Sequence, residues 1–150
     1  MHPAIERALT ADQAAVLGLL SRCDLPTEGV PEHLDQLLVA REPGGPSAPA
    51  RLIGCVGVEV YGRQAVLRSL AVAPESRGRG LGSRLMAEAL NLAKEAGCAE
   101  VFLLTRTIER MAERHGFVRI QRQQVPPSAL ASREFSLEQC STAVVMRRCV

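Results

Sequence analysis

Aromatic residues are scarce in this chain, which has no tryptophan, one tyrosine and three phenylalanines among 150 residues. The hydrophobic share is nevertheless 47%, so the chain can bury a proper core, and that core must be mainly aliphatic. The length is typical of a single domain, and we expect one domain over residues 1–150.

The chain also lacks a marked excess of positive or negative residues. Lys and Arg number 18 against 16 Asp and Glu, and no basic run is interleaved with aromatics, which argues against a nucleic-acid surface. No apolar run approaches the roughly 18 residues that a membrane helix needs. The first residues also lack the charged-then-apolar pattern of a signal peptide. We therefore expect a soluble cytoplasmic protein with no membrane or nucleic-acid partner.

The cysteines and histidines show no ligand spacing. The five cysteines are odd in number, widely separated and without a Cys-x-x-Cys pair, and the histidines are scattered. This pattern indicates neither a disulfide framework nor a zinc site, so we predict buried free thiols and no metal.

A glycine-rich loop is the most informative segment that is present. The apolar run Leu70-Ala71-Val72-Ala73 ends at Pro74, and glycines follow at alternate positions 78, 80 and 82, with Arg77 and Arg79 before and between them. A long amphipathic helix begins there. Glycines let a backbone approach an anion, and the first N–H groups of a helix have no internal partners, so the arrangement suits a pyrophosphate.

Two common phosphate-binding patterns do not fit this loop. The Gly-Lys-Ser/Thr ending of a P-loop is absent, and the Gly78-x-Gly80-x-Gly82 spacing differs from the dinucleotide fingerprint. A simple glycine-rich turn that caps a helix remains the alternative.

Periodicity and turn residues predict a mixed α/β (α+β) fold with six to seven strands, mostly antiparallel, and helices on both faces. The predicted strands are Ile5 to Ala8, Leu37 to Arg41, Arg51 to Tyr61, Gln64 to Val72, Glu100 to Leu104, Phe117 to Gln121 and Thr142 to Arg147. The predicted helices are Thr10 to Ser21, which opens with a capping box, Gly80 to Ala96 and Thr107 to His115, with a helical turn at Glu32 to Gln36.

The loop resembles the coenzyme A loop of the GNAT superfamily of N-acetyltransferases. The matching residues are Arg77-x-x-Gly80-x-Gly82 after a strand that ends Leu-Ala-Val. The resemblance implies the GNAT fold and acetyl-CoA as co-substrate. It assigns cofactor binding to the backbone of Leu70, Ala71 and Val72, which would pair with the pantetheine arm, and of Arg77, Gly78, Arg79, Gly80, Leu81 and Gly82, which would hold the pyrophosphate.

The resemblance fails at one position. Many members of the superfamily carry a tyrosine four residues before a Gly-Phe pair, where it protonates the leaving thiolate. Gly116-Phe117 is that pair here, and the matching residue is Ala112. Water, proton return from the amine, or Tyr61 must serve instead, and a non-catalytic acetyl-CoA-binding module stays open as an alternative.

A polar cluster is predicted from strand alternation. If Gly62-Arg63 forms a two-residue turn, Glu59, Tyr61 and Arg68 share one face of a hairpin. The functional interpretation makes Glu59 the general base and Arg68 the anchor for a substrate carboxylate. The structural interpretation is a cross-strand ion pair on a solvated face.

Two narrower resemblances concern the amine. The stretch from Leu103 to Phe117 looks like N-acetylglutamate synthase acetyltransferase domains, and segments along nearly the whole chain look like the arsenic-resistance (arsinothricin-type) N-acetyltransferases. Together they imply acetylation of glutamate or an analogue such as arsinothricin, with Arg68, Thr105 and Arg106 contacting carboxylates. Thr105 capping the next helix is the alternative.

Other options also stay open. Cys140, a lone thiol, does not by itself form an arsenic site. Protein N-terminal acetylation is a second enzymatic hypothesis. Superfamily members often dimerise, so a homodimer remains an option.

Overall fold

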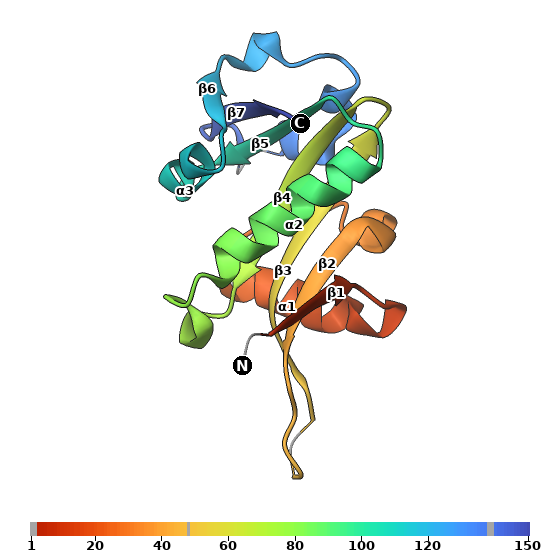
Figure 1. Ribbon diagram of the computed structural model, residues 1–150. Helices are drawn as coiled ribbons and strands as arrows, with labels where there is room; N and C mark the ends of the chain where they lie inside the picture. Colours follow the sequence, from red (N-terminus) through yellow and green to blue (C-terminus); the bar gives the residue numbers. More distant parts are fainter. Residues whose placement is uncertain (1–2, 48, 138–139) are drawn as a thin grey trace. The chain divides into compact units, whose positions relative to one another are not determined.

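The structure is a computed structural model that describes residues 3–47, 49–137 and 140–150 (Figure 1). Among these residues, the strands form one sheet in the order β1-β2-β3-β4-β5-β7-β6. The strands are β1 Ala4–Arg7, β2 Leu37–Glu42, β3 Arg51–Tyr61, β4 Gln64–Val72, β5 Glu100–Thr105, β6 Val118–Ile120 and β7 Val144–Cys149. The β4–β5 pairing is parallel, whereas β1–β2, β2–β3, β5–β7 and β6–β7 are antiparallel.

Three α-helices and six short 3₁₀ turns complete the described part of the chain. The helices are α1 Gln13–Arg22, α2 Leu81–Glu95 and α3 Glu109–Arg114. The 3₁₀ turns are η1 Thr10–Asp12, η2 Pro31–Gln36, η3 Pro74–Ser76, η4 Arg122–Gln124, η5 Ala129–Ala131 and η6 Arg133–Phe135. No helix in the described ranges is both long and apolar enough to cross a membrane.

The chain divides into two compact units, of which unit 1 comprises residues 1–57 and 69–86 and unit 2 comprises residues 58–68 and 87–150. Three elements, β3, β4 and α2, therefore contribute residues to both units.

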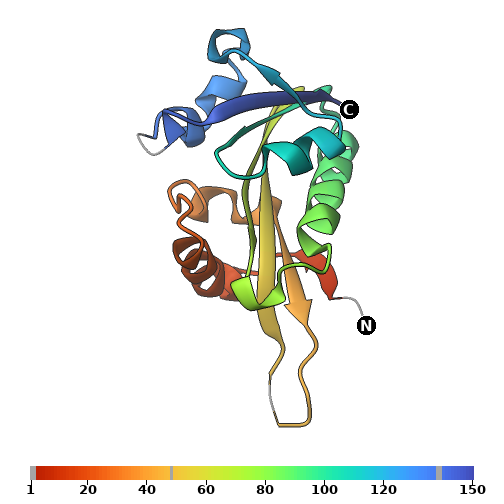
Figure 2. The same cartoon turned by 90° about the vertical axis from the view of Figure 1, so that its left-hand side faces the viewer.

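In unit 1, α1 and the first turns of α2 lie on opposite sides of β2 and β3 (Figure 2). Gly54 of β3 permits the close approach of α2. A Cβ at position 54 would lie 3.0 Å from Leu85 Cδ1 and 3.3 Å from the carbonyl oxygen of Ala71. A larger residue there would push the helix away from the strand, because packed interiors have little spare room.

The start of α1 differs from the prediction. Thr10 and Gln13 do not form the expected capping box. Instead the Asp12 carboxylate accepts a hydrogen bond of 2.7 Å from the Leu9 N–H. The same carboxylate binds both terminal nitrogens of Arg41 on β2, at 2.7 and 2.5 Å. The first turn is a 3₁₀ turn that is fixed by this ion pair.

Unit 2 has its own core on β4, β5 and β7. It is formed by Val66, Phe102, Val125, Ala129 and Val145, and the half-buried Tyr61, Leu104, Ile120 and Phe135 pack against it. Val125 and Ala129 belong to the segment after β6, which the sequence predicted only as irregular. Their burial holds this segment against the strands, where η5 and η6 form.

Most of the remaining elements agree with the prediction. The apolar face predicted for α2, Leu81, Leu85, Met86, Leu90 and Ala93, is buried throughout. The core is mainly aliphatic, as expected, although Phe102 and Phe117 are its largest fully buried side chains. The last strand lies two residues later than predicted, and α3 is shorter at both ends.

Candidate active site

The glycine loop of unit 1 has the backbone conformation that an anion cradle requires. Gly78 and Gly80 have φ angles of 83° and 78°, in the left-handed region that favours glycine. A Cβ built at either residue meets nothing within 4 Å, and the loop is exposed. The loop leads directly into α2, whose first N–H groups have no partners within the helix. Coenzyme A pyrophosphate therefore fits these residues in both space and charge.

Arg77 holds this loop in place by hydrogen bonds to other residues of unit 1. Its Nε donates to the Val72 carbonyl at 3.0 Å, and its Nη2 donates to the Cys23 sulfur at 3.5 Å. Its backbone N–H donates to the Pro74 carbonyl at 3.4 Å. Arg77 therefore fastens the loop to the end of β4, and the N–H groups predicted to hold the phosphates reduce to those from Gly78 onward.

The middle of β4 is distorted at Ser69. This residue has a φ of 60°, a value that non-glycine residues rarely adopt, and its carbonyl accepts a hydrogen bond from the Cys55 thiol at 3.2 Å. Leu70, Ala71 and Val72 follow at once, and the Ala73 N–H donates to the Ile53 carbonyl at 2.8 Å. The residues predicted to pair with pantetheine therefore directly follow an irregular point in the strand.

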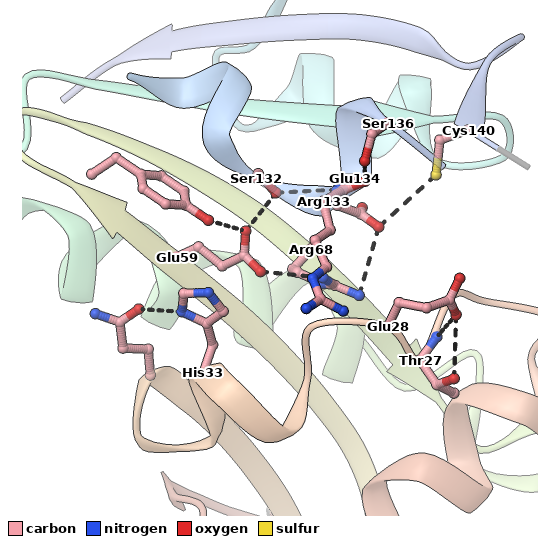
Figure 3. Close-up of polar contacts among 12 residues, drawn as sticks. Thr27, Glu28, His33, Glu59, Arg68, Ser132, Arg133, Glu134, Ser136 and Cys140 are labelled. Carbon is pink, nitrogen blue, oxygen red and sulfur yellow. Dashed lines mark hydrogen bonds and ion pairs between the residues drawn. The ribbon is translucent and has the colours of Figure 1, made fainter. Parts of the chain in front are cut away.

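Unit 2 brings the predicted polar cluster together (Figure 3). The turn at Gly62 and Arg63 has two residues, as predicted. Arg68 Nη1 on β4 then lies 3.1 Å from Glu59 Oε2 on β3, and Tyr61 Oη donates to Glu59 Oε1 at 2.9 Å. The side chains of Glu59 and Arg68 are each 2% exposed. The ion pair exists, but it is buried rather than on the solvated face that the structural interpretation assumed.

Two further residues complete the cluster, and sequence reasoning did not assign them to it. Ser132 Oγ donates to Glu59 Oε1 at 2.5 Å and accepts a hydrogen bond from the Glu134 N–H at 3.3 Å. Glu134 Oε2 lies 3.7 Å from Arg68 Nη2. Figure 3 shows both side chains pointing toward Glu59 and Arg68. They come from residues 129–135, which contain η5 and η6 and are called the 3₁₀ segment below. One guanidinium is thus shared by two buried carboxylates.

Arg122 holds the segment that carries Ser132 and Glu134. Its guanidinium donates to the carbonyls of Phe135 and Cys140, at 3.3 and 2.9 Å, and lies 5.8 Å from the centroid of the Phe135 ring. Ser128 Oγ adds a hydrogen bond of 2.7 Å to Gln64 Oε1. The segment that carries Ser132 and Glu134 is therefore held in place by Arg122 and Ser128.

The protonation of Tyr61 and Cys140 follows from their surroundings. Burial, followed by the hydrogen bond to Glu59, raises the pKa of Tyr61 to about 12. Burial, followed by the Glu134 charge, raises the pKa of Cys140 to about 11. Both groups are therefore neutral near pH 7, so Tyr61 keeps the hydrogen that it donates to Glu59.

The other predicted site residues of unit 2 lie in different settings. Thr105 Oγ1 accepts hydrogen bonds from the N–H groups of Thr107 and Ile108, at 3.1 and 2.9 Å, so it fixes the turn before α3. It does not cap the helix, because the N-cap residue of α3 is Ile108, whose side chain makes no capping hydrogen bond. Arg106 is exposed, and Ala112 is completely buried in α3. Within the described ranges, no group of three or more His, Cys, Asp or Glu residues is placed to hold a metal ion.

The acetyltransferase (GNAT) domain family model matches residues 33–119, which include the glycine loop, β3, β4 and β5. The chain belongs to this family. The mixed, mostly antiparallel seven-stranded sheet with its helices agrees with the GNAT fold, so the predicted fold and superfamily are confirmed.

Relatives and solved structures agree with this assignment. The GNAT chain is 36% identical over 72 residues to a probable glucosamine 6-phosphate N-acetyltransferase of Oryza sativa subsp. japonica, covering 45% of this chain and 43% of that protein. It is 33% identical over 100 residues to an uncharacterized N-acetyltransferase of Chlorobaculum tepidum, covering 66% and 60%. The chain thus spans about half the length of these two relatives.

A solved structure extends the likeness over the whole fold. N-acetylglutamate synthase of Neisseria gonorrhoeae, complexed with coenzyme A and N-acetyl-glutamate, matches with a TM-score of 0.81 and 18% identity, covering 99% of this GNAT chain and 35% of that one. At this identity the match shows the shared fold.

Proposed function

We propose that this protein is an acetyl-CoA-dependent N-acetyltransferase that acetylates the amine of a small amino-acid-like substrate, glutamate or an analogue such as arsinothricin. The observation that carries the acetyl-CoA part is the loop before α2, where Gly78 and Gly80 have left-handed backbones and open space in front of them. Membership of the GNAT family supports the reaction type.

Coenzyme A would be held by backbone groups of unit 1. The N–H groups from Gly78 to Gly82 would bind the pyrophosphate, and those of Leu70 to Val72 would pair with the pantetheine arm. The exposed Arg79 adds positive charge beside the loop. When bound, acetyl-CoA supplies the thioester whose acetyl group is transferred.

The buried cluster of unit 2 would handle the proton. A substrate amine attacks only after it loses its ammonium proton, so the reaction needs a base. We assign this role to Glu59, whose carboxylate accepts hydrogen bonds from Tyr61, Arg68 and Ser132. Tyr61 stays a candidate for the acid that protonates the thiolate, because the residue at the usual position is Ala112.

Carboxylate recognition is assigned to guanidinium groups. Arg68 is the buried candidate and Arg106 the exposed one. Thr105 is a weaker contact candidate, because its oxygen already accepts two backbone N–H groups. The resemblance to N-acetylglutamate synthase and arsinothricin-type sequences, together with the synthase fold in complex with N-acetyl-glutamate, supports an acidic amino acid as substrate.

Thiol release from acetyl-CoA tests the proposal. The purified chain is incubated separately with glutamate, arsinothricin, phosphinothricin, methionine sulfone and a short peptide. Turnover limited to glutamate-like amines supports it, and turnover with the peptide alone assigns the protein to N-terminal acetylation. Binding of acetyl-CoA by calorimetry without turnover of any amine would identify a non-catalytic acetyl-CoA-binding module.

A further inference from the structure

A buried thiol of unit 1 contacts β4 at its distorted point. Cys55 on β3 is completely buried, and its Sγ donates to the Ser69 carbonyl at 3.2 Å. Ser69 is the residue with the left-handed φ of 60°. This conformation is strained for a residue with a Cβ and persists only where neighbouring contacts hold it. The Cys55 thiol is one of the contacts that hold Ser69 in this conformation.

The thiol stays protonated and can therefore donate. Burial raises the pKa of Cys55 to about 12, so its sulfur carries a hydrogen near pH 7. A hydrogen bond from the Ala71 backbone acts on this pKa in the opposite direction, because it favours the thiolate. The Cys55 sulfur therefore contacts β4 on either side of Leu70, at the Ser69 carbonyl and at the Ala71 backbone.

Contacts of the next residues show which way the backbone of β4 turns after Ser69. The Ala73 N–H donates to the Ile53 carbonyl on β3 at 2.8 Å, whereas the Val72 carbonyl accepts a hydrogen bond from Arg77 Nε at 3.0 Å. The backbone groups of successive strand residues point in opposite directions. Leu70 and Val72 therefore turn their backbone groups away from β3.

We propose that Cys55 is a positioning residue for the pantetheine arm of acetyl-CoA, a role that rests on the proposed function. Its thiol holds Ser69 in the left-handed conformation, and this conformation sets the direction of the strand residues that follow. The arm would then pair with the backbone of Leu70 and Val72, on the side of β4 that faces away from β3. Cys55 itself touches neither substrate nor cofactor.

Two ligands separate this role from a general loss of structure. Acetyl-CoA contains the pantetheine arm, whereas 3′-phosphoadenosine 5′-diphosphate is the nucleotide half of coenzyme A and lacks it. Cys55→Ala should raise the Kd for acetyl-CoA by about three- to tenfold, the effect of losing one hydrogen bond. The Kd for the nucleotide should not change. Calorimetry measures both, and equal changes for the two ligands, or no change for either, overturn the proposal.

Cys98→Ala is the matched control, because Cys98 is also a buried thiol. Its Sγ donates to the Gly62 carbonyl at 3.8 Å, in unit 2. We expect this variant to bind both ligands as the wild type does. Selective loss of acetyl-CoA affinity in Cys98→Ala as well would show that removing any buried thiol is enough, and would overturn the proposal. If Cys55→Ala does not fold, Cys55→Val removes the donor without leaving a cavity and takes its place.

Glycine at position 69 tests whether the thiol acts through the Ser69 backbone. Glycine adopts a φ of about 60° without strain, so the Ser69→Gly background should no longer need the thiol. We expect Cys55→Ala to weaken acetyl-CoA binding less in this background than in the wild type. In the wild-type background, Cys55→Ser keeps a donor and should lose less affinity than Cys55→Ala. The same loss in both backgrounds, or equal losses in the serine and alanine variants, overturns the proposal.

The role of Cys55 and the proposed function fail in different ways. If the wild-type chain does not bind acetyl-CoA, the proposed function is wrong and the role of Cys55 falls with it. If the wild type binds acetyl-CoA and acetylates glutamate, and Cys55→Ala binds acetyl-CoA equally tightly, the function stands and only the role of Cys55 is wrong.

Discussion

Ser132 Oγ donates a hydrogen bond of 2.5 Å to Glu59 Oε1 across 73 residues of sequence, and both side chains are buried. This contact joins the 3₁₀ segment after β6 to the hairpin of β3 and β4. Because Glu134 from the same segment approaches Arg68, the segment supplies polar groups as well as apolar ones to unit 2. The candidate base is thus held by residues that are distant in the sequence.

Replacing Arg68 by Met should destabilise the protein strongly. The substitution leaves the carboxylates of Glu59 and Glu134 buried without the guanidinium, and breaking a buried pair in this way costs about 3–5 kcal/mol. Urea unfolding measures the change. Arg119→Met is the matched control, because its pair with Glu109 is largely exposed and should hardly affect the unfolding midpoint. Equal midpoint shifts in the two variants would contradict a special role for the buried pair.

Replacing Glu134 by Gln should strengthen the binding of a dicarboxylic substrate, if the proposed function holds. Glu134 lies 3.7 Å from Arg68, where it would compete with a substrate carboxylate for the same guanidinium. We expect the KM for glutamate to fall by up to about tenfold, equivalent to about 1.4 kcal/mol. The KM for acetyl-CoA should not change. A higher KM for glutamate would show that Glu134 helps to bind the substrate instead of competing with it.

The local parts of this structure were predictable from the sequence. Strand alternation and the Gly62-Arg63 turn placed Glu59, Tyr61 and Arg68 together, because a two-residue turn fixes the register of a hairpin. The bounds of β3 and β4 also agree with the prediction. Helical periodicity identified the buried face of α2, since each of its residues points to the same side.

Contacts between distant segments were not predictable in the same way. Glu134 lies in η6 and Ser132 is the residue between η5 and η6, where the sequence has no periodic pattern. The position of both residues depends on Val125, Ala129 and Arg122. The side chain that accepts a backbone N–H at the start of this helical region is Asp12 and not Thr10, because Arg41 on β2 holds the Asp12 carboxylate in place. In both places a tertiary ion pair or buried contact decides the local structure, and no neighbouring residue in the sequence indicates it.

Replacing Asp12 by Asn should make the free energy of unfolding depend less on pH between pH 7 and pH 3. The hydrogen bonds from Arg41 hold the pKa of Asp12 below its ordinary value. The ionised pair therefore stabilises the fold above the pKa of the unfolded chain, about 3.9, and this stability is lost as the pH falls through the lower pKa of the folded state. Urea unfolding from pH 7 to pH 3 should show the gap between the wild type and the variant closing toward acid. A gap that stays constant with pH would contradict this account.

Replacing Gly80 by Ala should weaken acetyl-CoA binding. At a φ of 78° an alanine is strained by about 1–2 kcal/mol, and because a Cβ there meets nothing within 4 Å, the strain comes from the backbone and not from a clash. We expect the loop to leave the conformation that presents its N–H groups, so the Kd for acetyl-CoA measured by calorimetry should rise. Gly18→Ala is the matched control, since this exposed glycine lies inside α1 with open space around it, and the change should stabilise the helix by about 0.5–1 kcal/mol. Unchanged acetyl-CoA binding by Gly80→Ala would show that the left-handed glycine is needed only to end the turn before α2.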